Sequence, residues 1–139
     1  MAKQKILHRS RCRATVYHIG YTARTHSSAG KGAEKLSFKS EEFDVIICLN
    51  VIDRVTHPRR LLNSISRVLK KDGIALVATP YDWGDDYTPV KNRISNIKQY
   101  FTNKKWEILF EQQYLPFVLF FNVRRKEYYR DHLLVVRKK

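Results

Sequence analysis

Two clusters of polar side chains stand directly after two apolar runs of the sequence, residues 43–49 and 74–78, where they are well placed to bind a small molecule. They combine an amide, carboxylates, a guanidinium and aromatic rings, which can hold a polar, cationic or aromatic ligand. The members are Asn50, Asp53 and Arg54 after the first run, and Tyr81, Asp82 and Trp83 after the second. A structural explanation is also open: Asn50 would only end a strand, and Asp53 and Arg54 would form a surface ion pair.

The apolar runs 43–49 and 74–78 predict the two strands that position these clusters. Both runs are rich in β-branched residues and nearly unbroken, which is typical of parallel strands with helices on both faces. Between them Pro58 begins a helix with apolar residues at helical spacing, and Gly73 closes it. Because the carboxyl ends of neighbouring parallel strands meet at one edge of a sheet, we expect the two clusters to lie side by side.

The segments FDVIICLNVIDRV, PRRLL and LKKDGIALVATPYDW occur in this order. Together they resemble the second half of the class I S-adenosylmethionine-dependent methyltransferase family, in which such a segment contains the fourth and fifth strands. Residues 33–44, AEKLSFKSEEFD, are similar to the family's loop before its fourth strand, and the resemblance covers residues 30–139. It implies an α/β fold, a reduced Rossmann-like methyltransferase sheet with flanking helices and a C-terminal antiparallel hairpin.

The resemblance also implies S-adenosylmethionine as the cofactor and a small molecule as the methyl acceptor. Ala33, Glu34 and Asn50 would contact the cofactor. The acceptor would contact Asp53, Arg54, Tyr81, Asp82 and Trp83. No metal ligands are implied, and no catalytic residue is assigned.

Two features of that family have no counterpart in this sequence. Relatives carry a Gly-rich turn after their first strand and an acidic residue at the end of their second strand, and both hold the cofactor. At the position before Ala33 where relatives carry an aspartate, this chain has Gly32. Losing several such contacts weakens binding by about a hundredfold or more, since each unpaired polar group costs about 1–3 kcal/mol. We therefore expect this chain to bind S-adenosylmethionine weakly or not at all.

The rest of the chain predicts one further helix and two edge strands. Thr88 and Pro89 are typical of a helix start, and apolar residues at helical spacing extend that helix to Phe101. Strands are expected near 106–112 and 131–137. PYDWGDDYTP and LPFVLFFNVRRKEYY are similar to methyltransferases that act on histidine-derived small molecules, although an apolar hairpin with a basic turn explains the second piece equally well.

The charge of the chain is unevenly distributed along the sequence. The formal net charge is +14, and residues 1–33 hold seven Lys and Arg but no Asp or Glu. We interpret residues 1–32 as a basic, irregular leader and residues 33–139 as the methyltransferase-like domain. Two cysteines give no disulfide framework, and no apolar run approaches the about 20 residues that span a bilayer. A cytoplasmic protein is expected, with organellar targeting by the acid-free leader as the alternative.

Three functions remain open from the sequence. The first is an enzyme that transfers a methyl group from S-adenosylmethionine to a small acceptor. The second is a degenerate, catalytically inactive methyltransferase-like protein. The third is a basic nucleic-acid-associated module, indicated by Tyr128 and Tyr129 among four arginine and lysine residues. The sequence does not identify the acceptor or the oligomeric state.

Overall fold

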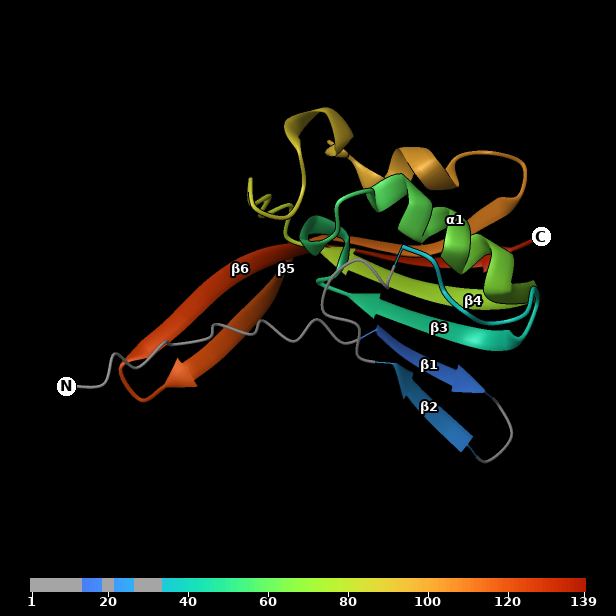
Figure 1. The fold of residues 1–139 in the computed structure, drawn as a ribbon, viewed down its shortest axis with the longest axis horizontal. Coiled ribbons are helices and arrows are strands. Elements are labelled where there is room, and N and C mark those ends of the chain that lie inside the picture. Colours follow the sequence, from blue (N-terminus) through green and yellow to red (C-terminus); the bar gives the residue numbers. More distant parts are fainter. Residues whose placement is uncertain (1–13, 19–21, 27–33) are drawn as a thin grey trace.

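The computed structural model describes residues 14–18, 22–26 and 34–139, which form one mixed sheet with helical segments beside it (Figure 1). Six strands pair in the order β2-β1-β3-β4-β6-β5. The elements are β1 (Ala14–His18), β2 (Thr22–His26), β3 (Phe43–Leu49), η1 (Ile52–Arg54), α1 (Pro58–Val68), β4 (Leu69–Thr79), η2 (Val90–Asn92), η3 (Ile97–Phe101), β5 (Trp106–Asn122) and β6 (Arg125–Lys138). Only β3 and β4 are parallel among the described strands.

The predicted strand–helix–strand unit is confirmed and forms the centre of the molecule. His57 is the N-cap of α1 and Pro58 its first residue, and the N–H of His57 donates to the carboxylate of Glu34 at 2.8 Å. The apolar side of α1 packs on the sheet, with Leu62 0% and Ile65 2% exposed. Burial of such a stripe, about 1.5–3 kcal/mol for each large side chain, is what holds a short helix in place.

The prediction that Gly73 closes the helix is wrong, because α1 ends at Val68 and Gly73 lies within β4. Leu69 is fully buried and pairs with Phe43, so the chain enters the sheet directly after the helix. The register then shifts before Val45 pairs with Ile74, and Asp72, with φ 62°, takes the left-handed conformation in the bulge between. A methyl group on Gly73 would meet the Lys70 carbonyl oxygen at 2.9 Å.

The helix predicted from Thr88 to Phe101 is also wrong, because two short 3-10 helices, η2 and η3, replace it. Thr88 is buried and donates its hydroxyl to the Val55 carbonyl at 2.6 Å instead of capping a helix. The chain is extended at Arg93 and Asn96, and the Asn96 side chain accepts the Lys98 N–H. Asparagine side chains that bind nearby backbone groups compete with helix formation in this way.

The irregular structure expected for the leader is wrong for ten of its residues. Residues 14–18 form β1, which pairs antiparallel with β3, and residues 22–26 form β2, which pairs with β1. The physical reason is that β3 would otherwise present an unpaired backbone edge, which β1 satisfies with its own N–H and C=O groups. The boundary between leader and domain remains a prediction.

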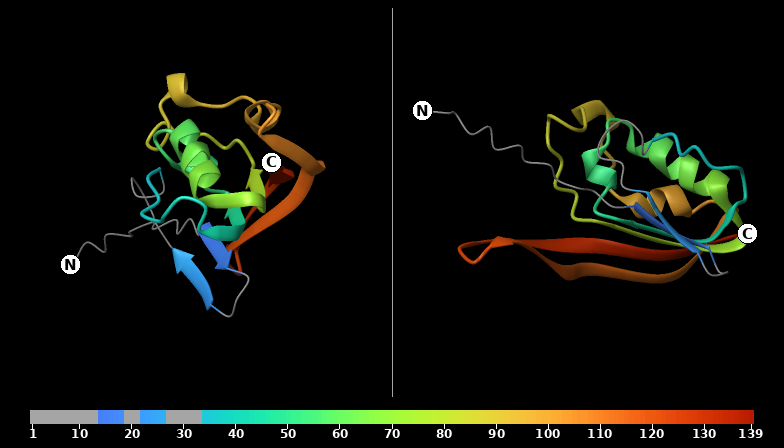
Figure 2. Two further views of the ribbon diagram at one scale, coloured as in Figure 1. Left: turned by 90° about the vertical axis from the view of Figure 1, so that its right-hand side faces the viewer. Right: turned by 60° about the horizontal axis from the view of Figure 1, so that its bottom comes forward.

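Helical segments cover one face of the sheet, as the right-hand view of Figure 2 shows. On that face Ile46, Cys48, Ala75 and Val77 are at most 1% exposed. Side chains of the opposite face are half-buried at Val45, Ile47, Ile74, Leu76, Leu133 and Val135. The second layer of helices that the apolar runs predict is not found among residues 14–18, 22–26 and 34–139.

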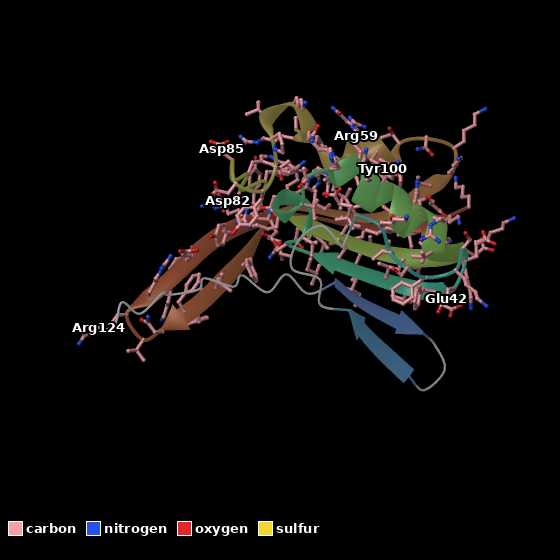
Figure 3. The ribbon with its side chains drawn as sticks, viewed as in Figure 1. Glu42, Arg59, Asp82, Asp85, Tyr100 and Arg124 are labelled. Carbon is pink, nitrogen blue, oxygen red and sulfur yellow. The ribbon has the colours of Figure 1, made fainter. Side chains whose placement is uncertain are left out.

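The two strands predicted at the C-terminal end are confirmed and are longer than expected, but only β5 is an edge strand, because β6 lies between β4 and β5. Strands β5 and β6 pair along almost their whole length, from Trp106 opposite Lys138 to Asn122 opposite Arg125. Their outer part, residues 115–130, extends past the rest of the sheet as a two-stranded ribbon, which we term the arm (Figure 1). Arg124 marks its far end (Figure 3).

Candidate functional site

The carboxyl ends of β3 and β4 bring the two predicted clusters together. Asn50 leaves β3 in the left-handed conformation, with φ 55°, and its N–H donates to the Ala78 carbonyl of β4 at 2.9 Å. Tyr81 leaves β4 in the same conformation, with φ 57°. Non-glycine residues in this region are uncommon and cluster at ligand sites. The prediction that residues after the two strands lie side by side is therefore confirmed by geometry.

Asp53, Arg54 and Asp82 form one ionic network at this edge. The Arg54 guanidinium lies 3.3 Å from the Asp53 carboxylate and 2.6 Å from the Asp82 carboxylate, and it also donates to the Asp82 carbonyl. The Asp82 N–H donates at 3.1 Å to the same Asp53 oxygen, Oδ2, that Arg54 contacts. Arg54 further lies over the Tyr87 ring, 5.5 Å from its centroid. The loop after β4 is thereby fixed to η1.

Asp53 and Asp131 are a pair of buried carboxylates at the same edge. Their residues are 1% and 3% exposed, and the Oδ1 atom of each has no hydrogen-bond partner among the described residues. Burial raises the pKa of both carboxyl groups, and the charge of Asp53 raises that of Asp131 further. A hydrogen bond from the Asn50 side chain opposes the shift at Asp131. Two buried acceptors of this kind can hold the N–H or O–H hydrogens of a ligand.

A second chain of polar contacts runs from Tyr81 across β6 to β5. The Tyr81 hydroxyl accepts the Ile97 N–H at 2.9 Å and lies 2.8 Å from His132 Nδ1. His132 Nε2 lies 3.0 Å from the Glu111 carboxylate, whose other oxygen accepts from Lys98 at 2.5 Å. Lys98, followed by His132, lowers the pKa of Glu111, while burial raises the pKa of Tyr81. Each ring nitrogen of His132 therefore has one partner.

One predicted cofactor contact, Glu34, does not join this group. Ala33 lies outside the described residues. Glu34 lies beside α1, where its carboxylate accepts the His57 N–H and its carbonyl oxygen accepts the Ser64 hydroxyl at 2.8 Å. An open cavity of about 680 Å³ lies there, lined by Glu34, Lys35, Thr56, His57, Arg60, Asn63 and Ser64. None of the residues at the carboxyl edge lines that cavity.

Trp83 is half-buried at the edge and packs beside Tyr81, with ring centroids 6.4 Å apart. Asp82 and Asp85 lie near the base of the arm, far from Arg124 at its tip (Figure 3). Asp85 pairs with Arg93. The acidic loop therefore borders the site but holds its own charge partners.

Asp131, His132 and Glu111 were not predicted as site residues from the sequence. For Asp131 and His132 the sequence does contain a signal. An antiparallel strand begins at the edge where its parallel neighbour ends, and Thr79 of β4 indeed pairs with His132 of β6. Asp131 and His132 are the polar residues directly before the apolar run LLVV. Polar residues that directly precede the apolar run of an antiparallel neighbouring strand are therefore candidate site residues, like the polar residues that follow the parallel strands.

Comparison with known proteins identifies the fold that carries this site. The family model of the methyltransferase domain matches residues 9–77, which include β1 to β3, α1 and most of β4. Over these residues the chain is similar to the class I methyltransferase family. The match begins within the leader, so the likeness to methyltransferases starts before the residues that carried the resemblance in the sequence.

Solved structures agree with a methyltransferase fold. A structure concerned with converting a disulfide bond into a thioacetal group during echinomycin biosynthesis has a TM-score of 0.57 and 14% identity. A candidate methyltransferase from Bacillus halodurans C-125 has a TM-score of 0.54 and 16% identity. Each alignment covers 78% of this chain, which spans 54% of the first structure and 75% of the second. No curated protein sequence matches the chain at a significant level.

Two further observations concern the described residues alone. None of their helices is long and apolar enough to cross a membrane. They contain no group of three or more His, Cys, Asp or Glu side chains arranged to hold a metal ion.

Proposed function

We propose that the chain carries the acceptor side of a site for S-adenosylmethionine-dependent methyl transfer to a small molecule. The observation that carries this proposal is the pair of buried carboxylates, Asp53 and Asp131, with one unpaired oxygen each among the described residues. They lie at the carboxyl edge of β3 and β4, where ligands bind in open α/β sheets. A buried carboxylate oxygen without a hydrogen-bond partner costs free energy unless a ligand donates a hydrogen bond to it. A methyl-accepting small molecule with N–H or O–H groups therefore fits these two carboxylates.

The cofactor fits the same edge in charge and in hydrogen bonding. When bound, it supplies a methyl group on a positively charged sulfur. Asn50 offers an amide at the tip of β3, where its backbone takes the left-handed conformation. We propose that Asn50 contacts the cofactor while Asp53 and Asp131 orient the acceptor. A Gly-rich turn is not among the described residues, so we expect weak cofactor binding by this chain.

The acceptor residues would act mainly by position. Holding two reactants in line lowers a barrier strongly without any covalent participation by the protein. A carboxyl group whose pKa is raised by burial is also a better proton acceptor than an exposed one. Asp131 would therefore take a proton from the N–H or O–H group that becomes methylated. Arg54 and Asp82 would keep the loop after β4 closed against η1.

The experiment is transfer of a tritiated methyl group from S-adenosylmethionine to a panel of small amines, imidazoles and phenols. We expect slow transfer to at least one class with the wild type and a loss of about a hundredfold with Asp131→Asn. Asp86→Asn is the matched control, since Asp86 is an exposed member of the acidic loop. No transfer by the wild type, or equal transfer by Asp131→Asn, would contradict the proposal.

A further inference from the structure

The arm has one face that is rich in rings and cations and contains no acid. Cross-strand pairing places Pro116 opposite Arg130, Val118 opposite Tyr128 and Phe120 opposite Lys126 on this face. We term these six residues the outer face. Phe120 is 66% and Tyr128 74% exposed, and Lys126 and Arg130 are exposed as well. The proposed methyl transfer uses none of them.

The opposite face of the arm is already satisfied by its own contacts. Glu127 accepts from Arg125 and from the Tyr129 hydroxyl, each at 2.6 Å, and the bond to Glu127 raises the pKa of Tyr129 to about 12. Tyr129 packs near Phe117, with ring centroids 6.1 Å apart. Glu127 and Tyr129 on this face are half-buried, whereas Lys126, Tyr128 and Arg130 on the outer face are exposed.

Rings and cations on the outer face alternate in the way that single-stranded nucleic acids require. Phe120 and Tyr128 are diagonal neighbours across the two strands, a separation of about 7–8 Å. Lys126 lies next to both, with its ammonium 4.9 Å from the centroid of the Phe120 ring. Bases stack on exposed aromatic rings regardless of sequence, while lysine and arginine follow the phosphates. The absence of an acidic residue on this face removes repulsion toward a polyanion.

Two other occupants fit the arm less well. Lys126 lies against the Phe120 ring and Arg125 against the Phe121 ring. Insertion of these rings into a bilayer would bring the cations into the hydrocarbon, which is costly, so a membrane fits the arm less well. A second copy of the chain carries the same net charge of +14. Its acidic loop is also partly neutralised, because Asp82 and Asp85 already pair with Arg54 and Arg93.

We infer that the outer face of the arm binds single-stranded nucleic acid. This inference does not rest on the proposed methyl transfer, since none of the six residues of the outer face belongs to the pair of buried carboxylates. It predicts binding that depends on the two rings, prefers single strands to duplexes and weakens with salt.

The test is fluorescence anisotropy of the full chain with a labelled oligothymidine of about 20 nucleotides, and with a duplex of equal length, between about 50 and 200 mM salt. We expect Phe120→Ala combined with Tyr128→Ala to weaken oligothymidine binding at least about tenfold. Lys126→Gln combined with Arg130→Gln should lower the slope of log affinity against log salt by about 1.4. Lys91→Gln combined with Lys104→Gln removes the same charge from exposed positions outside the arm and should change neither quantity.

Unfolding cannot explain a loss in these variants if their circular dichroism matches that of the wild type, as exposed positions lead us to expect. The inference is overturned if the ring variant binds like the wild type or if the Lys91 and Lys104 variant loses as much affinity as the arm variants. Equal affinity for the duplex would overturn it too. So would ring-dependent binding to anionic phospholipid vesicles without ring-dependent binding to oligothymidine.

Discussion

The hydroxyl of Tyr81 lies 2.8 Å from Nδ1 of His132, which ties the loop after β4 to the middle of β6. The same hydroxyl accepts the N–H of the fully buried Ile97 at 2.9 Å. One phenol therefore connects the loop that borders the site, the sheet and η3. Its position depends on the left-handed conformation of Tyr81, whose N–H donates to the Thr79 hydroxyl at 3.1 Å.

Tyr81→Phe should lower the free energy of unfolding by about 1–3 kcal/mol, because it leaves a buried N–H and a histidine nitrogen without their partner. Urea denaturation followed by tryptophan fluorescence measures this. Tyr87→Phe is the control, since Tyr87 is exposed and its contact with Arg54 needs only the ring. If both variants were equally stable, the hydroxyl of Tyr81 would have no structural role.

Asp131→Asn should stabilise the protein relative to the wild type increasingly as the pH rises. Burial raises the pKa of Asp131 above its ordinary value of 3.8, so the folded state holds the proton more tightly than the unfolded state. The contribution of Asp131 to stability is therefore fully present below pH 3.8 and is lost as the pH rises through the raised folded pKa. Asparagine does not ionise and escapes that loss.

Melting temperatures of wild type and Asp131→Asn across a pH series from acid to neutral give this dependence. The difference between the two should grow toward neutral pH. For Asp86→Asn, at an exposed position, the difference in melting temperature from the wild type should not change with pH. A difference at Asp131 that shrinks toward neutral pH would mean that the ionised carboxylate is stabilised by a partner.

Gly73→Ala should destabilise the fold by about 1–3 kcal/mol, in the range of other overpacked positions. The added methyl group would lie 2.9 Å from the Lys70 carbonyl oxygen and 2.8 Å from Leu69 Cδ1. The backbone oxygen cannot move without opening the bulge at the start of β4. Thermal denaturation measures the effect, and an unchanged melting temperature would show that the bulge adapts freely.

How far the sequence predicted the structure depended on whether the determining contacts were local. The runs around Ile46 and Val77 and the Pro58 helix start are local patterns, and they gave β3, β4 and α1. Gly73 misled because a glycine after a helix resembles a C-cap, whereas the pairing of Leu69 with Phe43 is a contact between distant residues. The side chain of Asn96 accepts a hydrogen bond from the Lys98 N–H, which interrupts the helix predicted after Thr88. Hydrophobic periodicity does not reveal such a bond.

The site was predictable only where parallel strands end. Asn50, Asp53 and Tyr81 follow from that rule, and the structure brings them to one edge. Asp131 and His132 come from the antiparallel strand β6, whose pairing with β4 had to be known before their position could be. The cofactor contacts assigned to Ala33 and Glu34 came from resemblance alone. Glu34 instead caps α1 through His57.

Cys48 should be unreactive in the native protein, as its place in the middle of β3 predicts. It is buried, with 1% of its surface exposed, and buried thiols are inert. A Cys12→Ser variant leaves Cys48 as the single thiol of the chain. We expect labelling with a thiol reagent to be slow without denaturant and fast in urea. Fast labelling under native conditions would be inconsistent with the central position of β3.

Saturation-transfer nuclear magnetic resonance with S-adenosylhomocysteine tests whether the carboxyl end of β3 holds the cofactor, because it detects binding as weak as millimolar. We expect transfer to the ligand from the wild type and from the exposed-site control Lys91→Ala, and a loss of transfer with Asn50→Ala. Transfer that is absent from the wild type at several millimolar ligand, or unchanged in Asn50→Ala, would contradict a cofactor site at the carboxyl end of β3.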